Sequence, residues 1–263
     1  MPKVDTLKEI VQKKKEKIIL AKQALPEEQL KAQINGLAPA RPFIEAINKP
    51  RTISLIAEIK KYSPSAGLLR QEFDPKTIAG IYQEAGVQAI SVLTEEDYFQ
   101  GGLSYINEIK SLVSVPILRK DFILEPYQVY ESRAFGADAV LLIAELLTKE
   151  NLIQIMQIAD SLGLDYLVEV HDERQLKKIL TLKEVNLIGI NNRNLHNLEV
   201  DSQITEKLFP LIPKNKAVVV ESGIKTSQDV LFLKILGVNA ILVGTAFMQA
   251  ENIQRKVEEL MGW

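Results

Sequence analysis

The sequence contains no cysteine. This absence excludes disulfide bonds, thiolate metal sites and a cysteine nucleophile or base. Only two histidines occur, His171 and His196, and they are not spaced as metal ligands, so we expect no metal site. We interpret His171 as a loop residue and His196 as an exposed residue, and we expect neither to act in catalysis.

Long apolar runs and a large excess of charge are also absent. The longest apolar stretches, such as residues 139–144, are far too short to span a membrane. The chain opens into a charged segment rather than the apolar core of a signal peptide, so we expect a cytoplasmic protein. A net charge of −2 offers no basic surface for nucleic acid. We therefore expect neither a membrane nor a nucleic acid as a partner.

What the sequence does contain is a regular alternation of apolar and amphipathic stretches. Eight apolar runs predict strands, at residues 53–60, 89–94, 116–120, 139–144, 165–170, 187–191, 217–222 and 240–244. Helical patterns follow them, at residues 76–85, 104–112, 126–135, 149–162, 172–182, 202–209, 227–236 and 252–260. The sequence contains neither a dinucleotide-binding motif nor a P-loop motif, so neither of those folds is an alternative. Eight strand–helix units predict an α/β fold, a parallel (β/α)₈ TIM barrel.

The first 50 residues have a different pattern. Residues 6–24 predict an amphipathic helix, and two shorter helices are expected after Pro26 and from Phe43 to Asn48. We predict that residues 1–50 form a helical extension packed on the barrel of residues 51–263, within one structural domain overall. The lysine run 13–15 is interpreted as a solvated helix face.

Local signals mark where the barrel helices begin and end. Asp74 and Pro75 predict a helix start, as N-cap and first-turn proline. Gly86, Gly136 and Gly237 each stand just past a predicted helix, and a strand begins within three residues of each. A residue that ends a helix commonly has the left-handed backbone conformation, and glycine adopts this conformation freely.

Charged and polar residues gather at the carboxyl ends of the predicted strands. They are Glu58, Lys60, Lys120, Glu169, Asn191, Arg193 and Glu221. The opposite strand ends carry almost no charge, and a purely structural barrel has no reason to collect desolvated charge at one rim. Because the carboxyl ends meet at one mouth of the barrel, this set predicts general acid–base work on an anionic substrate.

A phosphate pocket is predicted beside these residues. Ser222-Gly223 stand at the end of the seventh predicted strand, and Gly244-Thr245 stand at the end of the eighth. This is the usual place for a phosphate in such barrels, held by backbone N–H groups. Glycine is expected at position 244 because a side chain would block that approach.

Five segments carry a resemblance to a known family: residues 57–65, residues 91–94 with Tyr98-Phe99, residues 118–122, residues 189–195 and residues 220–224. Together they resemble indole-3-glycerol phosphate synthases, from the N-terminal helices to the last helix. The resemblance implies a (β/α)₈ barrel with an N-terminal helical extension that acts in tryptophan biosynthesis. It also implies ring closure of 1-(2-carboxyphenylamino)-1-deoxyribulose 5-phosphate, with loss of carbon dioxide and water and without cofactor or metal.

The resemblance also implies residue roles. Lys120 is similar to the general acid, Glu169 to the base of the dehydration, and Lys60 to the lysine that holds the substrate carboxylate. The remaining roles are these: Glu58 and Asn191 orient Lys60, Arg193 assists at the anthranilate end, Phe122 stacks on the anthranilate, Glu221 and Ser222 contact hydroxyls and relay protons, and Ser63, Gly223, Gly244 and Thr245 contact the phosphate. Neighbouring cations are expected to depress the lysine pKa.

Two other functions remain open at this point. A Schiff-base aldolase would also use strand-end lysines in a phosphate-binding barrel. A non-catalytic barrel that binds phosphorylated ligands is the second alternative. We expect a monomer, with a dimer as the alternative, and we expect the acidic loop Glu95 to Asp97 to slow an anionic substrate if it lies near the mouth.

Overall fold

The computed structural model describes residues 6–263, and its centre is a closed barrel of eight parallel strands. The barrel strands are β1 (Ser54–Ile59), β4 (Ala89–Leu93), β5 (Ile117–Lys120), β6 (Ala139–Ile143), β7 (Asp165–Val170), β8 (Leu187–Asn191), β9 (Ala217–Glu221) and β10 (Ala240–Val243). Each pairs with the next along the chain, and β10 returns to β1 with Ser54 opposite Ala240. The predicted barrel is confirmed, and each strand lies within two residues of its predicted bounds.

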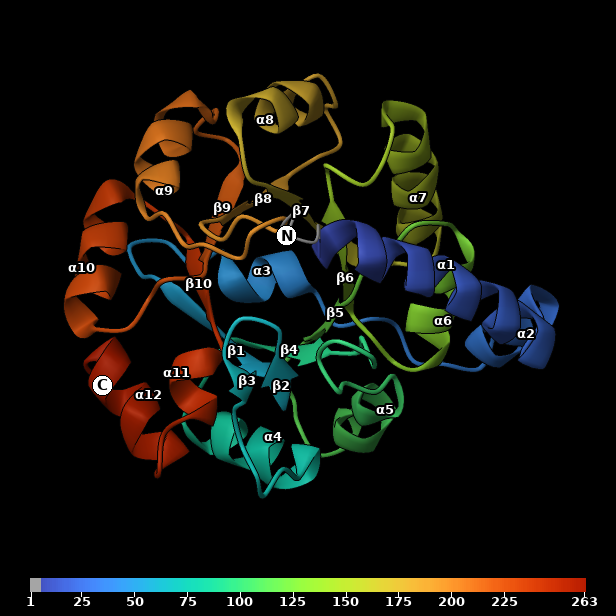
Figure 1. Ribbon diagram of the computed structural model, residues 1–263, viewed down its shortest axis with the longest axis horizontal. Helices are drawn as coiled ribbons and strands as arrows, with labels where there is room; N and C mark the ends of the chain where they lie inside the picture. The colour runs from blue at the N-terminus through green and yellow to red at the C-terminus, as the bar shows by residue number, and fades with distance from the viewer. Residues whose placement is uncertain (1–5) are drawn as a thin grey trace, which may run out of the picture.

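A ring of helices surrounds the strands (Figure 1). Its members are α4 (Pro75–Glu84), α5 (Ser104–Lys110), α6 (Tyr127–Ala134), α7 (Lys149–Ser161), α8 (Glu173–Leu180), α9 (Gln203–Leu208), α10 (Ser227–Leu236) and α12 (Ile253–Met261). Three short elements were not predicted: the 3₁₀ turn Phe209–Leu211, the helix α11 (Thr245–Met248), and a hairpin of β2 (Tyr62–Ser63) and β3 (Gly67–Leu68) in the loop after β1. None of the helices in residues 6–263 combines the length and apolar character that a membrane crossing requires.

The predicted helix boundaries follow from local contacts. The Asp74 carboxylate accepts the backbone N–H groups of Lys76 and Thr77, so it caps α4. Gly86, Gly136 and Gly237 have φ of 73°, 93° and 102°, the left-handed region expected of a residue that ends a helix.

The third helix of the extension, α3 (Phe43–Ile47), closes the amino end of the barrel. The backbone N–H of Ile44 donates to the carboxylate of Asp165, the first residue of β7, at 2.9 Å. Phe43 and Ile47 are fully buried in an apolar cluster with residues that line the strand starts, including Ala139. This contact ties the extension to the barrel interior.

The first helix, α1 (Thr6–Ala24), packs over the opposite end. Leu7 and Ile10 join the same apolar cluster as Phe122, which follows β5. Lys14 of α1 is buried and its Nζ lies 2.7 Å from Asp121 Oδ1, so the interpretation of residues 13–15 as a solvated face is wrong for Lys14. A buried carboxylate needs a cation, and this helix brings one. The helix α2 (Glu27–Ile34) then packs against α6.

Candidate active site

Charged side chains from three alternate strands meet at the carboxyl end of the barrel. Lys120, at the end of β5, lies between two carboxylates. Its Nζ donates to Glu169 Oε2 of β7 at 2.7 Å, and it lies 2.8 Å from Glu221 Oε2 of β9. Both carboxylates are almost fully buried. The structure therefore brings the predicted acid and base into direct contact and adds Glu221 to them.

The charge state of Lys120 differs from our expectation. Burial lowers the pKa of Lys120, but the negative charges of Glu169, Glu221 and Glu58 outweigh burial and raise the pKa above its ordinary value of 10.5. The expectation of a depressed pKa is wrong for this lysine, because its nearest charged neighbours are carboxylates rather than cations. Lys120 is therefore a protonated donor at neutral pH.

The two carboxylates that contact Lys120 have different proton affinities. Burial raises the pKa of Glu169, but the charges of Lys120 and His171 outweigh it and lower the pKa below 4.5. Burial raises the pKa of Glu221 to about 7, because Lys120 opposes this effect only in part and Glu169 adds to it. Glu221 Oε1 is buried and has no hydrogen-bond partner within residues 6–263. Glu169 is thus an ionised base, and Glu221 can hold a proton near neutral pH.

The second predicted lysine lies at the end of β1. Lys60 Nζ donates to Glu58 Oε2 at 2.5 Å. Glu58 fills the space beside Gly244: a Cβ at position 244 would lie 2.4 Å from Glu58 Oε2. The structure therefore explains this glycine differently from the sequence analysis, because the group that a side chain would displace is the Glu58 carboxylate.

Two predicted residues, the last residue of β8 and one in the loop after it, support the same region of the mouth. The Asn191 side-chain oxygen accepts the backbone N–H of Arg193 at 2.9 Å. The Arg193 guanidinium donates to the Leu198 carbonyl oxygen at 2.8 Å. Burial lowers the pKa of Arg193, and the negative charge of Glu58 opposes that effect. The Arg193 side chain is thus held by its own loop, and the negative charge of Glu58 stabilises its protonated form.

An aromatic pair lies beside the extension. The ring of Phe122 is 6.3 Å from the ring of Phe99, centroid to centroid, and the planes are tilted by 41°. The stacking of Phe122 on the anthranilate stays a prediction. Phe99 lies in a segment that carries the family resemblance, but no role was predicted for it. Its nearness to Phe122 depends on the pairing of β4 with β5.

The predicted phosphate residues leave neighbouring strands at the same end. Glu221 of β9 pairs with Leu242 of β10, so Ser222-Gly223 and Gly244-Thr245 follow these strands side by side. Ser222 and Gly223 both have positive φ, 67° and 83°. No backbone or side-chain acceptor within residues 6–263 takes the N–H of Gly223, Gly244 or Thr245. Ser63, in the hairpin after β1, is buried with its Oγ 3.5 Å from Ser65 Oγ.

His171 is a residue that the sequence analysis dismissed. It directly follows β7, and its side chain is only 8% exposed with Nε2 3.1 Å from Glu169 Oε1. The sequence contained a signal for this contact, because residues two apart on a strand share one face. His196 is exposed as expected, and its Nε2 lies 2.8 Å from Glu145 Oε1.

The acidic loop after β4 is neutralised in part by one lysine of α1. Lys17 of α1 lies 2.5 Å from Glu96 Oε2 and 3.1 Å from Asp97 Oδ2. Glu95 is buried and accepts the backbone N–H groups of Tyr98 and Phe99. The expected repulsion of an anionic substrate is therefore reduced by Lys17 of α1.

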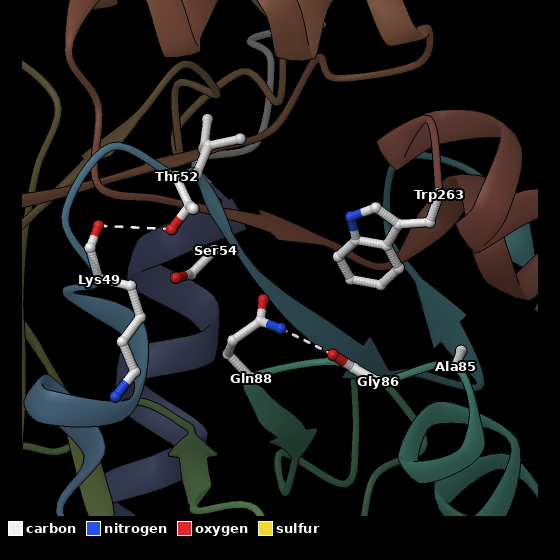
Figure 2. A pocket seen from close by; sticks show the side chains of 8 residues that line it. Lys49, Thr52, Ser54, Ala85, Gly86, Gln88 and Trp263 are labelled. Carbon is white, nitrogen blue, oxygen red and sulfur yellow. Dashed lines mark hydrogen bonds between the residues drawn. The ribbon is translucent and has the colours of Figure 1, made fainter.

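The cavity at the amino end of β1 is not a second site of this kind. Within residues 6–263 no three His, Asp or Glu side chains are placed to share a metal ion. A cavity of about 400 Å³ lies at the amino end of β1, away from the charged mouth, and Figure 2 shows the Trp263 indole across it from Lys49 and Thr52. It contains no cluster of acids and bases.

A parallel barrel with a lysine held between two buried glutamates at its carboxyl-end mouth is the arrangement of a barrel enzyme that works by acid–base chemistry. The family model for indole-3-glycerol phosphate synthase matches residues 7–260. The chain belongs to this family, whose members are carboxy-lyases of tryptophan biosynthesis.

Individual relatives agree with this assignment. The chain is 44% identical over 254 residues to indole-3-glycerol phosphate synthase of Alkaliphilus metalliredigens, covering 97% of each chain. It is 48% identical over 224 residues to the same enzyme of Acetivibrio thermocellus, covering 85% of this chain and 86% of the relative. Among solved structures, 3-hexulose-6-phosphate synthase of Salmonella typhimurium superposes with a TM-score of 0.61 at 15% identity, covering 80% of this chain and 97% of the other. This last likeness is one of fold.

Proposed function

We propose that the mouth of this barrel closes the indole ring of indole-3-glycerol phosphate. The substrate is 1-(2-carboxyphenylamino)-1-deoxyribulose 5-phosphate, and the other products are carbon dioxide and water. One observation carries the proposal: Lys120 Nζ is held 2.7 Å and 2.8 Å from Glu169 and Glu221 at the carboxyl end of the barrel. The family to which the chain belongs names the reaction.

The residues supply the acid and the base in the order that the chemistry requires. Attack of the aromatic carbon on the ribulose carbonyl develops negative charge on oxygen, and Lys120, protonated because its pKa is raised, donates a proton to it. Loss of carbon dioxide restores aromaticity. The departing hydroxide then needs an acid while a proton leaves the ring system. Glu169, ionised because its pKa is lowered, takes that proton, and Glu221 relays one at the hydroxyl.

The remaining residues hold the substrate. Lys60 binds the carboxylate that is lost, and Glu58 orients Lys60 through their ion pair. Asn191 and Arg193 support the anthranilate end, and Phe122 with Phe99 stacks against its ring. The phosphate is bound by backbone N–H groups and hydroxyls of Ser63, Ser222, Gly223, Gly244 and Thr245.

Kinetics of three variants test these roles. Lys120→Met and Glu169→Gln should each lower kcat by roughly 10²–10⁴ with little change in KM, because each removes a proton transfer made in the transition state. Lys60→Met should also raise KM, because its partner is the ground-state carboxylate. Lys15→Met, on the exposed face of α1, is the matched control. Formation of indole absorbance measures turnover, and near-parental kcat in Lys120→Met would reassign the acid to Lys60.

The same proteins separate the alternatives. A Schiff-base aldolase needs an uncharged lysine, and the raised pKa of Lys120 opposes it, so borohydride with a carbonyl substrate should trap no adduct on this residue. A non-catalytic barrel would bind the substrate without releasing product. We further propose that the chain acts as a monomer in the cytoplasm, with a small phosphorylated molecule and no nucleic acid as its partner.

A further inference from the structure

The Nδ1 side of the His171 ring determines its tautomer. Gln175 Oε1 accepts the backbone N–H of His171 at 2.8 Å, and Gln175 Nε2 donates to Asp172 Oδ2 at 3.2 Å. A backbone N–H can only donate and a carboxylate can only accept, so these two neighbours decide which end of the amide is the oxygen. That oxygen lies 3.4 Å from His171 Nδ1. Because a carbonyl oxygen cannot donate, Nδ1 carries a proton.

The Nε2 side of the ring therefore faces Glu169 with one proton to share. Nε2 lies 3.1 Å from Glu169 Oε1, while the other oxygen of Glu169 accepts from Lys120. With Nδ1 protonated, a neutral ring presents a lone pair at Nε2, and a lone pair repels a carboxylate oxygen. A proton on either group removes the repulsion. Nε2 is buried and has no well-aligned hydrogen-bond partner in residues 6–263, so a small rotation is needed to complete this contact.

The charges around the ring favour the imidazolium. Carboxylates face it from its own strand, Glu169, and from the segment after β6, Glu145, while α8 contributes the neutral Gln175. Burial lowers the pKa of His171, but these groups outweigh burial and raise the pKa above 6.5. These charges favour a second proton on the ring beside the Glu169 carboxylate.

We propose that His171 is the positioning residue of Glu169: its ring lies 3.1 Å from Oε1 of this carboxylate and keeps the base ionised before it acts. The inference rests on the proposed role of Glu169 as the base. When Glu169 accepts the substrate proton, the negative charge beside the ring is lost. A protonated ring then favours release of this proton from Glu169 to water as the product leaves. The carboxylate is restored, and one proton has left the site.

Nuclear magnetic resonance of the imidazoles tests the proton sharing without any substrate. The chain has only two histidines, so His196→Gln leaves the signals of His171 alone. We expect a His171 pKa above 6.5, nitrogen shifts of the Nδ1–H tautomer in the neutral ring, and a fall of this pKa in Glu169→Gln. An Nε2–H tautomer, or a pKa that Glu169→Gln leaves unchanged, would overturn the inference.

Kinetics then test what the shared proton does. In His171→Asn the acidic limb of the kcat profile should move to higher pH with KM unchanged, because the pKa of Glu169 rises when the ring is lost. His196→Gln is the matched control and should keep the parental profile. Added imidazole should move the acidic limb of His171→Ala back toward lower pH, since it would replace the ring beside Glu169. An acidic limb that His171→Asn leaves unchanged would overturn the inference, whereas an inactive parent would overturn the proposed function and leave the resonance result standing.

Discussion

Two glutamates contact the same lysine, yet their pKa values are shifted in opposite directions. Glu169 and Glu221 are both buried and both lie within 2.8 Å of Lys120 Nζ. Glu169 also faces His171, whereas Glu221 Oε1 has no hydrogen-bond partner within residues 6–263. The nearby His171 makes the difference: Glu169 is an ionised base, whereas Glu221 can hold a proton near neutral pH.

The proton on Glu221 should appear in the stability of the protein. Between about pH 4.5 and 7 this carboxyl is protonated in the folded chain and ionised in the unfolded chain. Folding then takes up a proton, so the free energy of unfolding falls as the pH rises, by a few kcal/mol for this group. A glutamine at position 221 cannot titrate, so the free energy of unfolding of Glu221→Gln should not fall by this amount over the same pH range.

Urea unfolding of both proteins at several pH values measures the difference between the two curves. Glu169 does not interfere in this window, because its pKa is lowered and its effect falls below pH 4.5. Parallel curves for the parent and Glu221→Gln would contradict the assignment of the proton to Glu221.

At the scale of elements, neighbouring strands set the space that each side chain receives. β1 and β10 are paired in the barrel, which brings Glu58 beside Gly244. A Cβ at position 244 meets this carboxylate, and Glu58 in turn holds Lys60. The absence of a side chain on one strand thus positions a charge on the next.

Gly244→Ala should therefore damage catalysis through Glu58. The added methyl group displaces the carboxylate from Lys60, and a misplacement of this size can cost about 100-fold in kcat/KM. The matched control is Gly80→Ala in α4, where a Cβ has nothing within 4 Å. In a Glu58→Ala background the Gly244→Ala change should cost almost nothing further; equal losses in both backgrounds would show that the glycine serves another neighbour.

The docking of α1 depends on one buried ion pair. Lys14 Nζ lies 2.7 Å from Asp121 Oδ1, and Arg119 holds the other oxygen at 3.0 Å. Lys14→Met should lower the free energy of unfolding by about 3 kcal/mol, because a buried carboxylate loses one of its two cations. Lys15→Met, one residue along and exposed, should change it by less than about 0.5 kcal/mol.

The pH dependence gives a second check of this ion pair. Burial raises the pKa of Asp121, but Lys14 and Arg119 outweigh burial and hold it well below 3.8. Its contribution to stability is therefore present above the unfolded pKa and is lost only as the pH falls below that value. Equal unfolding free energies for Lys14→Met and Lys15→Met at neutral pH would show that the extension is held by its apolar contacts alone.

At the scale of the whole molecule, the extension reaches both ends of the barrel. α3 covers the amino end through Phe43 and Ile47, while α1 reaches the mouth through Leu7 and Lys14. The two ends thus have different partners. The amino end is closed by apolar packing, and the carboxyl end keeps its charges beside a covering helix.

The proposed monomeric state can be tested at the outer surface. A group of exposed apolar side chains lies on one turn of α10, namely Leu231, Phe232 and Ile235. Sedimentation equilibrium at micromolar concentration should give the mass of one chain, 29.5 kDa. A dimer that Ile235→Asp dissociates would contradict this and identify α10 as the interface.

The sequence by itself determined which segments become strands and helices, where they end, and which charges stand at the strand ends. These features depend on neighbours along the chain: the apolar run of β6, the Asp74 cap of α4, and left-handed glycines such as Gly136. The order of strands in a closed barrel follows from the regular alternation of such segments. The family resemblance then assigned roles to residues at matching positions.

Only the tertiary structure decided what those charges do. The pKa of Lys120 rises rather than falls because Glu169 and Glu221 arrive from other strands, and no pattern along the chain contains that distance. The same holds for Lys14, which is buried because Asp121 needs a cation, and for Gly244, which leaves room for Glu58. Electrostatic and steric energies depend on separation in space, and that separation exists only after the barrel has closed.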